Sequence, residues 1–171
     1  MPDPTPEDAA RSAARRFCGW HVTPVREDDE VTLDGPGSVL LVLPTLRLIK
    51  LTSVVENGVE LDVDTDLFVS ARGLVRKRCG AWWSRNYGSI VVTMTHGFPA
   101  DVDADDNEPN AADFNAAVAS IAGRSPLATT TKGRVKAVGP FQYYDEAMAT
   151  GSAFTVVERA LLEQYRLESA P

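Results

Sequence analysis

The stretch RLIKLTSVVENGVELDV, residues 47–63, decides the fold that the sequence predicts. Apolar and polar residues alternate on both sides of Asn57-Gly58, a dipeptide that favours a two-residue hairpin turn because both residues tolerate positive φ. β-branched residues dominate the flanks, as they do in strands. We therefore predict two antiparallel strands joined at Asn57-Gly58.

Segments on either side of this stretch repeat the same plan. EVTLDGPGSVLLVLP (30–44) predicts a strand, a glycine-proline turn and a second strand. DLFVSARGLVRKR (66–78) predicts a hairpin around Arg72-Gly73, and SIVVTMTHGF (89–98) predicts a closing strand. Short strands with tight turns indicate hairpins in a small barrel or sandwich rather than a parallel sheet.

Helical patterns lie outside the β-rich region. At the start of the chain, Thr5 is a predicted N-cap, followed by Pro6 and Asp8, and Gly19 ends the helix. Its apolar stripe is predicted to consist of Ala9, Ala13 and Phe17. This alanine-rich surface favours close packing on a second alanine-rich helix, which we predict at residues 111–123.

Two further helices follow the β-rich region. AADFNAAVASIAG (111–123) places Phe114, Val118 and Ile121 on one face and ends at a glycine. Near the C-terminus, Thr155 and Glu158 have the spacing of a capping box. The face of that last helix is predicted to consist of Val157, Leu161 and Tyr165.

The segment TKGRVKAVGPFQYYDEAMATG, residues 131–151, fits neither a helix nor a paired strand. Alternating bases would project to one side of an extended backbone, and aromatic side chains of the kind enriched at binding hot spots follow them. We predict a docking arm, with a solvated surface loop as the alternative. The candidate docking residues are Lys132, Arg134, Lys136, Val138, Phe141, Tyr143 and Tyr144, together with Leu161 and Tyr165 of the last helix.

The predicted fold class is α+β, with a small helical core, a β-rich hairpin insertion and a long extended arm. The expected segments are an N-terminal helix (1–19), the β-rich insertion (20–99), an acidic linker with the central helix (100–124), the arm (125–153), and the C-terminal helix with its tail (154–171).

Composition restricts the function classes. The formal net charge of −7 disfavours a protein that coats nucleic acid or an anionic membrane, since both tasks need a positive surface. No apolar run is long enough for a membrane span, and no signal-peptide pattern opens the sequence. We therefore expect Cys18 and Cys79 to be reduced, buried thiols.

The sequence offers little for catalysis. His21 and His96 lie at the edges of the β-rich region, where we expect them to bond backbone, and no common hydrolase, zincin or nucleoside-triphosphatase motif occurs. The two cysteines and two histidines lack the paired spacing of a zinc site. The acidic run at 101–108 lacks the glycine and glutamate of a calcium loop. We predict no enzyme, no cofactor and no metal.

One alternative function stays open. AWWSRNYG (81–88) combines aromatic residues with nearby bases, a pattern that can stack single-stranded nucleic acid. The candidate contacts are Arg76, Arg78, Trp83, Arg85 and Tyr87.

Several ordered segments together carry a family resemblance. They are RRFCGWHVTPV (15–25), VTLDGPGS (31–38), LVLPTLRLIKLTSVVENGV (41–59), GLVRKRCGAWWSRNYGSIVVTMTHGF (73–98), AVGPFQYY (137–144) and VVERALLEQYRL (156–167). In this order the chain resembles the head-to-tail adaptor (head completion, connector) proteins of tailed phages that infect actinobacteria.

The resemblance implies a structural virion protein in the neck, assembled in the host cytoplasm. Such a protein would form a ring, dodecameric in this family, between the portal and the tail. Its implied partners are the portal protein, neighbouring copies of itself and a downstream neck or tail-terminator protein. Double-stranded DNA would pass through the channel without sequence-specific binding, and no membrane partner is implied.

Overall fold

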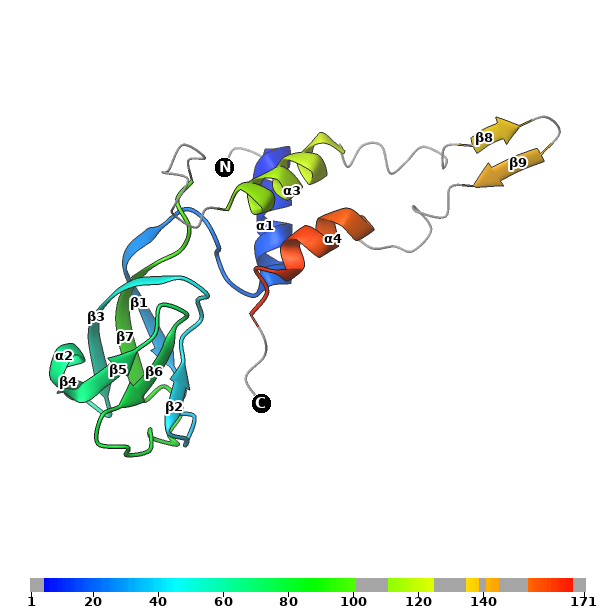
Figure 1. Ribbon diagram of the computed structural model, residues 1–171. Helices are drawn as coiled ribbons and strands as arrows, with labels where there is room; N and C mark the ends of the chain where they lie inside the picture. Colours follow the sequence, from blue (N-terminus) through cyan, green and yellow to red (C-terminus); the bar gives the residue numbers. More distant parts are fainter. Residues whose placement is uncertain (1–4, 101–110, 125–134, 139–140, 145–153, 168–171) are drawn as a thin grey trace. The chain divides into compact units, whose positions relative to one another are not determined.

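The computed structural model describes residues 5–100, 111–124, 135–138, 141–144 and 154–167 (Figure 1). The chain divides into two units. A helical unit combines Met1–Phe17 with Ala112–Arg166, and a β unit comprises Cys18–Ala111 and Leu167–Pro171. The mixture of helices and antiparallel sheets confirms the predicted α+β class.

The β unit contains two antiparallel sheets. The four-stranded sheet has the order β1-β7-β3-β4, with bounds Arg26–Leu33, Ile90–His96, Leu48–Glu56 and Val59–Leu61. The three-stranded sheet has the order β2-β6-β5, with bounds Leu40–Val42, Leu74–Lys77 and Leu67–Val69. A one-turn helix, α2 (Val63–Asp66), leads from the first sheet into β5.

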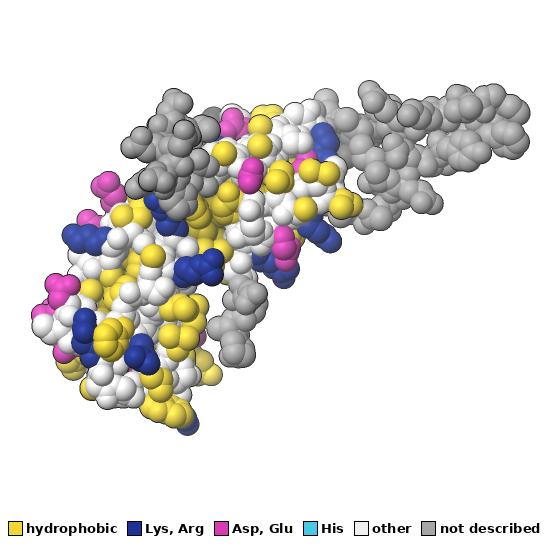
Figure 2. Space-filling view, in the orientation of Figure 1, with side chains coloured by type: hydrophobic (Ala, Val, Ile, Leu, Met, Phe, Trp, Pro, Cys, Tyr) yellow, Lys and Arg dark blue, Asp and Glu magenta, His cyan; other side chains and the backbone are white. Residues whose placement is uncertain are grey.

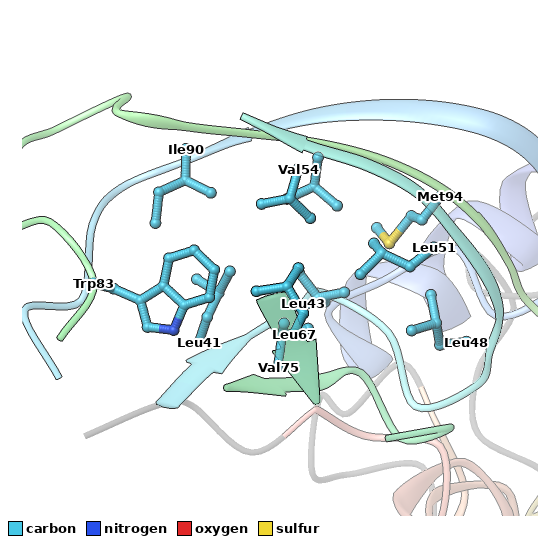
Figure 3. Close-up of a cluster of buried hydrophobic side chains, with 11 residues drawn as sticks. Leu41, Leu43, Leu48, Leu51, Val54, Leu67, Val75, Trp83, Ile90 and Met94 are labelled. Atoms are coloured by element: carbon cyan, nitrogen blue, oxygen red, sulfur yellow. The ribbon is translucent and has the colours of Figure 1, made fainter. Parts of the chain in front are cut away.

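A hydrophobic core lies between the two sheets (Figure 3). Alternate residues of each strand enter it, because successive side chains of a strand point to opposite faces. The four-stranded sheet contributes Leu48, Leu51, Val54, Ile90, Val92 and Met94, and the facing side contributes Leu41, Leu43, Leu67, Val75 and Trp83. The arrangement is a small sandwich, one of the two predicted architectures.

Two of the predicted hairpins are confirmed. Asn57 and Gly58 join β3 to β4 with φ values of 50° and 80°, and Arg72-Gly73 joins β5 to β6. The strands predicted on either side of the glycine-proline segment are present as β1 and β2, but they do not pair with each other, because β1 pairs with β7 and β2 pairs with β6.

The glycine-proline segment instead connects one sheet to the other. Gly35 N–H donates to Asn86 O at 2.9 Å, and Gly37 N–H donates to Ser84 O at the same distance. A Cβ at Gly35 would lie 2.2 Å from Ser84 O. Glycine is needed here for close backbone approach between distant segments, and a local sequence pattern cannot tell that use from a hairpin turn.

The helical unit contains α1 (Pro6–Cys18), α3 (Ala112–Gly123) and α4 (Val156–Glu163). Both predicted N-caps are confirmed: Thr5 and Asp8 bond reciprocally at 3.2 Å, and Thr155 and Glu158 form a complete capping box. α1 is followed by Gly19, whose φ of 81° ends the helix.

The buried helix faces differ partly from those predicted. On α1 the buried residues are Ala10, Ala14 and Cys18, one position after the predicted stripe, because alanines recur at the same spacing on both neighbouring faces. On α3, Phe114 and Val118 are buried as predicted.

The predicted face of α4 is also shifted. Tyr165 is buried as predicted, but Glu158 and Leu162 are buried as well, whereas Leu161 is half-buried and Val157 is 69% exposed. The hydrophobic pattern could not indicate that a glutamate is buried on this helix.

The segment predicted as an extended arm contains a hairpin. β8 (Val135–Val138) and β9 (Phe141–Tyr144) pair antiparallel, with Lys136 opposite Tyr143 and Val138 opposite Phe141. Lys132 and Arg134 lie outside the described residues. The five predicted segment boundaries stay a prediction.

Candidate functional site

The three-stranded sheet presents an apolar outer face with arginines on it. Leu41, Val75 and Leu67 point into the core, so the residues beside them point outward. The strand register places Leu40, Arg76 and Phe68 in one row across the sheet. Val42 and Leu74 form the next row, continued by Ser70, whose N–H donates to Leu74 O.

Hydrophobic side chains on this face are unusually exposed. Leu40, Val42, Phe68, Val69 and Leu74 are each 38–45% exposed. Leu40, Phe68, Leu74 and Val69, the last residue of β5, line a shallow hollow of about 310 Å³ together with Ser70 and Arg76. Contiguous exposed apolar surface of this kind marks an interaction site.

Two arginines cover Phe68. The guanidinium carbon of Arg78 lies 4.3 Å from the ring centroid and that of Arg76 lies 5.3 Å from it. Arg78 Nε also donates to Leu67 O at 3.0 Å, which holds its side chain along β5. Figure 2 shows Lys and Arg side chains beside the hydrophobic ones over these strands. We call Leu40, Val42, Phe68, Leu74, Arg76 and Arg78 the arginine face.

The loop after β6 exposes two aromatic rings. Trp82 is 60% exposed with Arg85 5.8 Å from its ring centroid, and Tyr87 is 90% exposed. The loop is held by Glu56, whose carboxylate accepts from Ser84 N–H at 2.7 Å and from Lys77 Nζ at 2.5 Å.

Trp83 cannot stack on a nucleotide in this structure. It is 2% exposed, lies in the core and has Lys77 Nζ 4.7 Å from its ring centroid. The prediction of Trp83 as a nucleic-acid contact is therefore wrong, whereas Arg76, Arg78, Arg85 and Tyr87 are exposed. Trp82 is the tryptophan that is available to a partner.

The two histidines pack against each other inside the β unit. Their ring centroids are 4.5 Å apart, and Trp20 contacts both rings. His21 Nε2 donates to Pro24 O at 2.8 Å, as a backbone-bonding residue does. His96 Nε2 donates to Asp29 Oδ2 at 3.1 Å.

The neighbouring histidine and arginine side chains lower the pKa of Asp29. The hydrogen bond from His96 lowers the pKa of the Asp29 carboxyl, and Arg26 adds a weaker effect in the same direction. Asp29 therefore stays ionised as an acceptor, and the arrangement supports the fold at the end of β1.

The cysteines do not form a site together. Cys18 is buried, as predicted, whereas Cys79 is exposed, which contradicts the prediction of two buried thiols. Within the described ranges no cluster of His, Cys, Asp or Glu could hold a metal ion. No helix in the same ranges is long and apolar enough to cross a membrane.

The predicted docking residues that the structure describes lie on β8, on β9, on α4 and just after α4. Lys136 and Val138 lie on β8, and Phe141, Tyr143 and Tyr144 lie on β9. Leu161 is half-buried on α4. Tyr165 packs edge-on against Phe114 at 5.9 Å and is 8% exposed, so its ring belongs to the interior of the helical unit.

Sequence reasoning missed the apolar part of the arginine face. Leu40, Val42, Phe68 and Leu74 read as ordinary strand residues, and the alternating pattern does not say which face is buried. The one available signal was that β2 and β5 are apolar at nearly every position, as strands covered on both faces are.

Comparison with known proteins shows the fold. No protein-family model matches the chain, and no curated protein matches it. The chain is similar to a chain of the neck of a native GTA (gene transfer agent) particle computed with C12 symmetry, with 18% identity and a TM-score of 0.56. This match covers 97% of this chain and 82% of that chain.

A second match is to the neck of an empty GTA particle computed with C6 symmetry. It also has 18% identity and a TM-score of 0.56, and it covers 97% of this chain and 78% of that chain. The similarity therefore extends over nearly the whole chain, and it establishes a fold shared with chains of these particle necks.

Proposed function

We propose that this chain is a structural subunit of the neck of a phage-like particle, where copies form a ring between portal and tail. The observation that carries the proposal is the fold shared with neck chains over 97% of the chain. The sequence resemblance to head-to-tail adaptors, which rests on segments of both units, supports the same role. The ring extends the DNA channel and joins head to tail.

The symmetry of the related particles supports a ring of twelve copies. The two similar chains belong to necks computed with C12 and C6 symmetry. Twelve subunits satisfy both symmetries, and a closed ring multiplies weak contacts because each interface raises the effective concentration of the next.

The surface of the chain supports an assembly role rather than catalysis. The arginine face exposes hydrophobic side chains that an isolated subunit would leave in water. The histidines are buried among aromatic rings, where they hold strand ends together. We propose that the protein is not an enzyme and acts through contacts with the portal, its own copies and the next neck or tail protein.

The charge of the chain suits a DNA channel. Each Lys or Arg that neutralises a phosphate adds affinity that salt weakens, and such affinity would slow DNA passage. A subunit with a net charge of −7 holds DNA weakly, so DNA passes without sequence-specific binding.

The deciding experiment measures the mass of the purified chain alone and after mixing with the portal protein of the same particle. We expect a complex that contains one ring of this chain on each portal ring, seen by native mass spectrometry and by electron microscopy. An intact portal ring that binds no copy of this chain at any mixing ratio would refute the proposal.

A second candidate function is the stacking of single-stranded nucleic acid. The observation that favours it is the exposed pair Trp82 and Tyr87, with Arg85 beside Trp82. Single-stranded DNA would then quench tryptophan fluorescence at low salt, and Trp82→Phe would abolish the quenching. Unchanged fluorescence of the wild-type protein at low salt removes this candidate.

A further inference from the structure

The sandwich has a second outer face, on the four-stranded sheet, and its charges are opposite to those of the arginine face. Val54, Ile90, Val92 and Met94 point into the core, so the residues between them point away from it. Because the core lies between the sheets, the two outer faces lie on opposite sides of one unit.

The strand register defines this second face. Glu30, Thr93 and Ser53 form one row across the sheet, and Ser53 Oγ donates to Thr93 Oγ1 at 3.1 Å. The next row contains Thr32, Val91, Val55 and Glu60. We call these residues, with Asp28 and Thr95, the acidic face.

Carboxylates lie along both edges of the acidic face, and small side chains fill its middle. Glu30 and Asp28 are on the edge strand β1, and Glu60 is on the edge strand β4. Asp28 reaches over β7, because its N–H donates to Thr95 Oγ1 and its carboxylate accepts from Thr52 Oγ1. Lys50, opposite Thr95, is a base at one end of this face.

The opposite charges are not neutralised within the unit. Among the described residues, no ion pair involves Arg76, Arg78, Glu30 or Glu60. These groups are exposed and therefore available for pairing with another molecule.

We propose that the arginine face of one copy binds the acidic face of a second copy. Arg76 and Arg78 then meet Glu30 and Glu60, while Leu40, Val42 and Leu74 cover Val91, Val55 and threonine methyl groups. A contact between two different faces is heterologous, so each bound copy still presents one free face of each kind, and repetition closes a ring if the rotation permits. The closed ring rests on the proposed function, whereas the pairwise contact does not.

A second copy fits the arginine face better than nucleic acid does. A phosphate backbone would pair with the two arginines but would leave Leu40, Val42 and Leu74 in water. The acidic face supplies both the carboxylates and an apolar surface between them, so it matches both parts of the arginine face.

The test uses two full-length variants with reversed charges. In Arg76→Glu/Arg78→Glu the arginine face becomes acidic, and in Glu30→Arg/Glu60→Arg the acidic face becomes basic. Sedimentation at low salt and high protein concentration measures self-association of each variant and of their equimolar mixture. We expect each variant alone to self-associate about 100-fold more weakly than the wild type, because like charges then meet, and the mixture to recover wild-type association.

Recovery on mixing also shows that both variants are folded. The control is Arg16→Glu/Arg159→Glu, with one substitution on α1 and one on α4. It changes the net charge by the same amount as Arg76→Glu/Arg78→Glu, and we expect it to associate like the wild type. Should a variant fail to fold by circular dichroism, the milder pair Arg76→Gln and Glu30→Gln replaces it, with an expected weakening of about tenfold.

Three outcomes overturn the inference: a wild-type protein that stays monomeric, charge-reversed variants that associate normally, or folded variants whose mixture does not associate. If either variant still formed rings on the portal, the proposed contact between the arginine face and the acidic face would be refuted, and the proposed function would stand. Association that follows the charges without any portal binding would instead remove the proposed function alone.

Discussion

Adjacent residues of one type have opposite roles in the β unit. Trp83 fills the core between the sheets, and Trp82 next to it is 60% exposed. The hydrogen bond from the backbone N–H of Trp83 to Ser38 O, 2.8 Å long, fixes the backbone so that the ring of Trp83 turns inward. Ser38 is distant in sequence, so this orientation is decided by tertiary structure.

The two tryptophans should therefore differ sharply in their contribution to stability. Trp83→Ala removes a large side chain from the core and is expected to lower the free energy of unfolding by about 3–5 kcal/mol. Trp82→Ala is the matched control, with an expected change within about 0.5 kcal/mol. Urea denaturation measures both, and equal losses would contradict the assignment of Trp83 to the core.

Glu158 is a residue whose charge stabilises the helical unit. It is 3% exposed and accepts from Thr155 N–H at 2.9 Å, from Ser120 Oγ at 2.8 Å and from Arg124. Burial, the largest single effect, raises the pKa of its carboxyl, but these hydrogen bonds together outweigh it, so the net pKa is lowered.

A lowered pKa has a definite consequence for acid stability. The unfolded chain binds the proton more tightly, so the stabilisation is present above the unfolded pKa and is lost as the pH falls through the folded pKa. Glu158→Gln should lower the free energy of unfolding by about 1–2 kcal/mol at neutral pH, and the difference from wild type should shrink below about pH 4. Melting temperatures measured across this range test it, and a difference that does not change with pH would contradict it.

At the scale of elements, hairpin turns follow local chemistry. Gly58 and Gly73 both have positive φ, 80° and 76°, as the sequence signals for turns require. Their surroundings differ, because a Cβ at Gly58 meets nothing within 4 Å whereas one at Gly73 would lie 2.7 Å from Thr45 O.

Substituting each glycine by alanine therefore measures backbone strain alone at Gly58, and backbone strain together with steric overlap at Gly73. Gly58→Ala should cost about 1 kcal/mol, from the left-handed backbone alone. Gly73→Ala should cost about 2 kcal/mol or more, since the backbone of Thr45 must also shift. Denaturation of the two variants side by side is the measurement, and equal costs would show that the Thr45 contact yields freely.

Pairing between elements does not follow local chemistry. β1 and β2 are consecutive and joined by a glycine-rich segment, yet they belong to different sheets. β1 pairs with β7, which is distant in sequence, because this places Val31 and Leu33 beside the core residues Val92 and Ile90. The gain from burying several side chains exceeds what one tight turn contributes.

At the scale of the whole molecule, the chain combines a helical unit formed from both ends of the sequence with a β unit inserted between them. The β8–β9 hairpin belongs to the helical unit. Two-stranded hairpins are marginally stable alone in water. This one is therefore suited to gain stability from a partner.

Replacing residues 131–151 by a glycine-serine linker of equal length should leave the two units folded and abolish joining to the portal. Circular dichroism should show little change in melting temperature, because the core of the β unit and the α3–α4 contact are untouched. Phe141→Ala is expected to weaken joining in the same assay. Full portal binding by the linker variant would show that this segment is not the docking arm.

The sequence by itself determined the α+β class and several local features: the caps at Thr5 and Thr155 and the turns at Asn57-Gly58 and Arg72-Gly73. Each of these depends on residues within a few positions of one another. Tertiary structure decided the pairing of strands into two sheets, the burial of Trp83 instead of Trp82, and the arginine face with its opposite, acidic face. Those features depend on which residues, distant in sequence, share a core. Hydrophobic burial selects among the possible strand pairings, and it does so only when these distant segments come together in the folded chain.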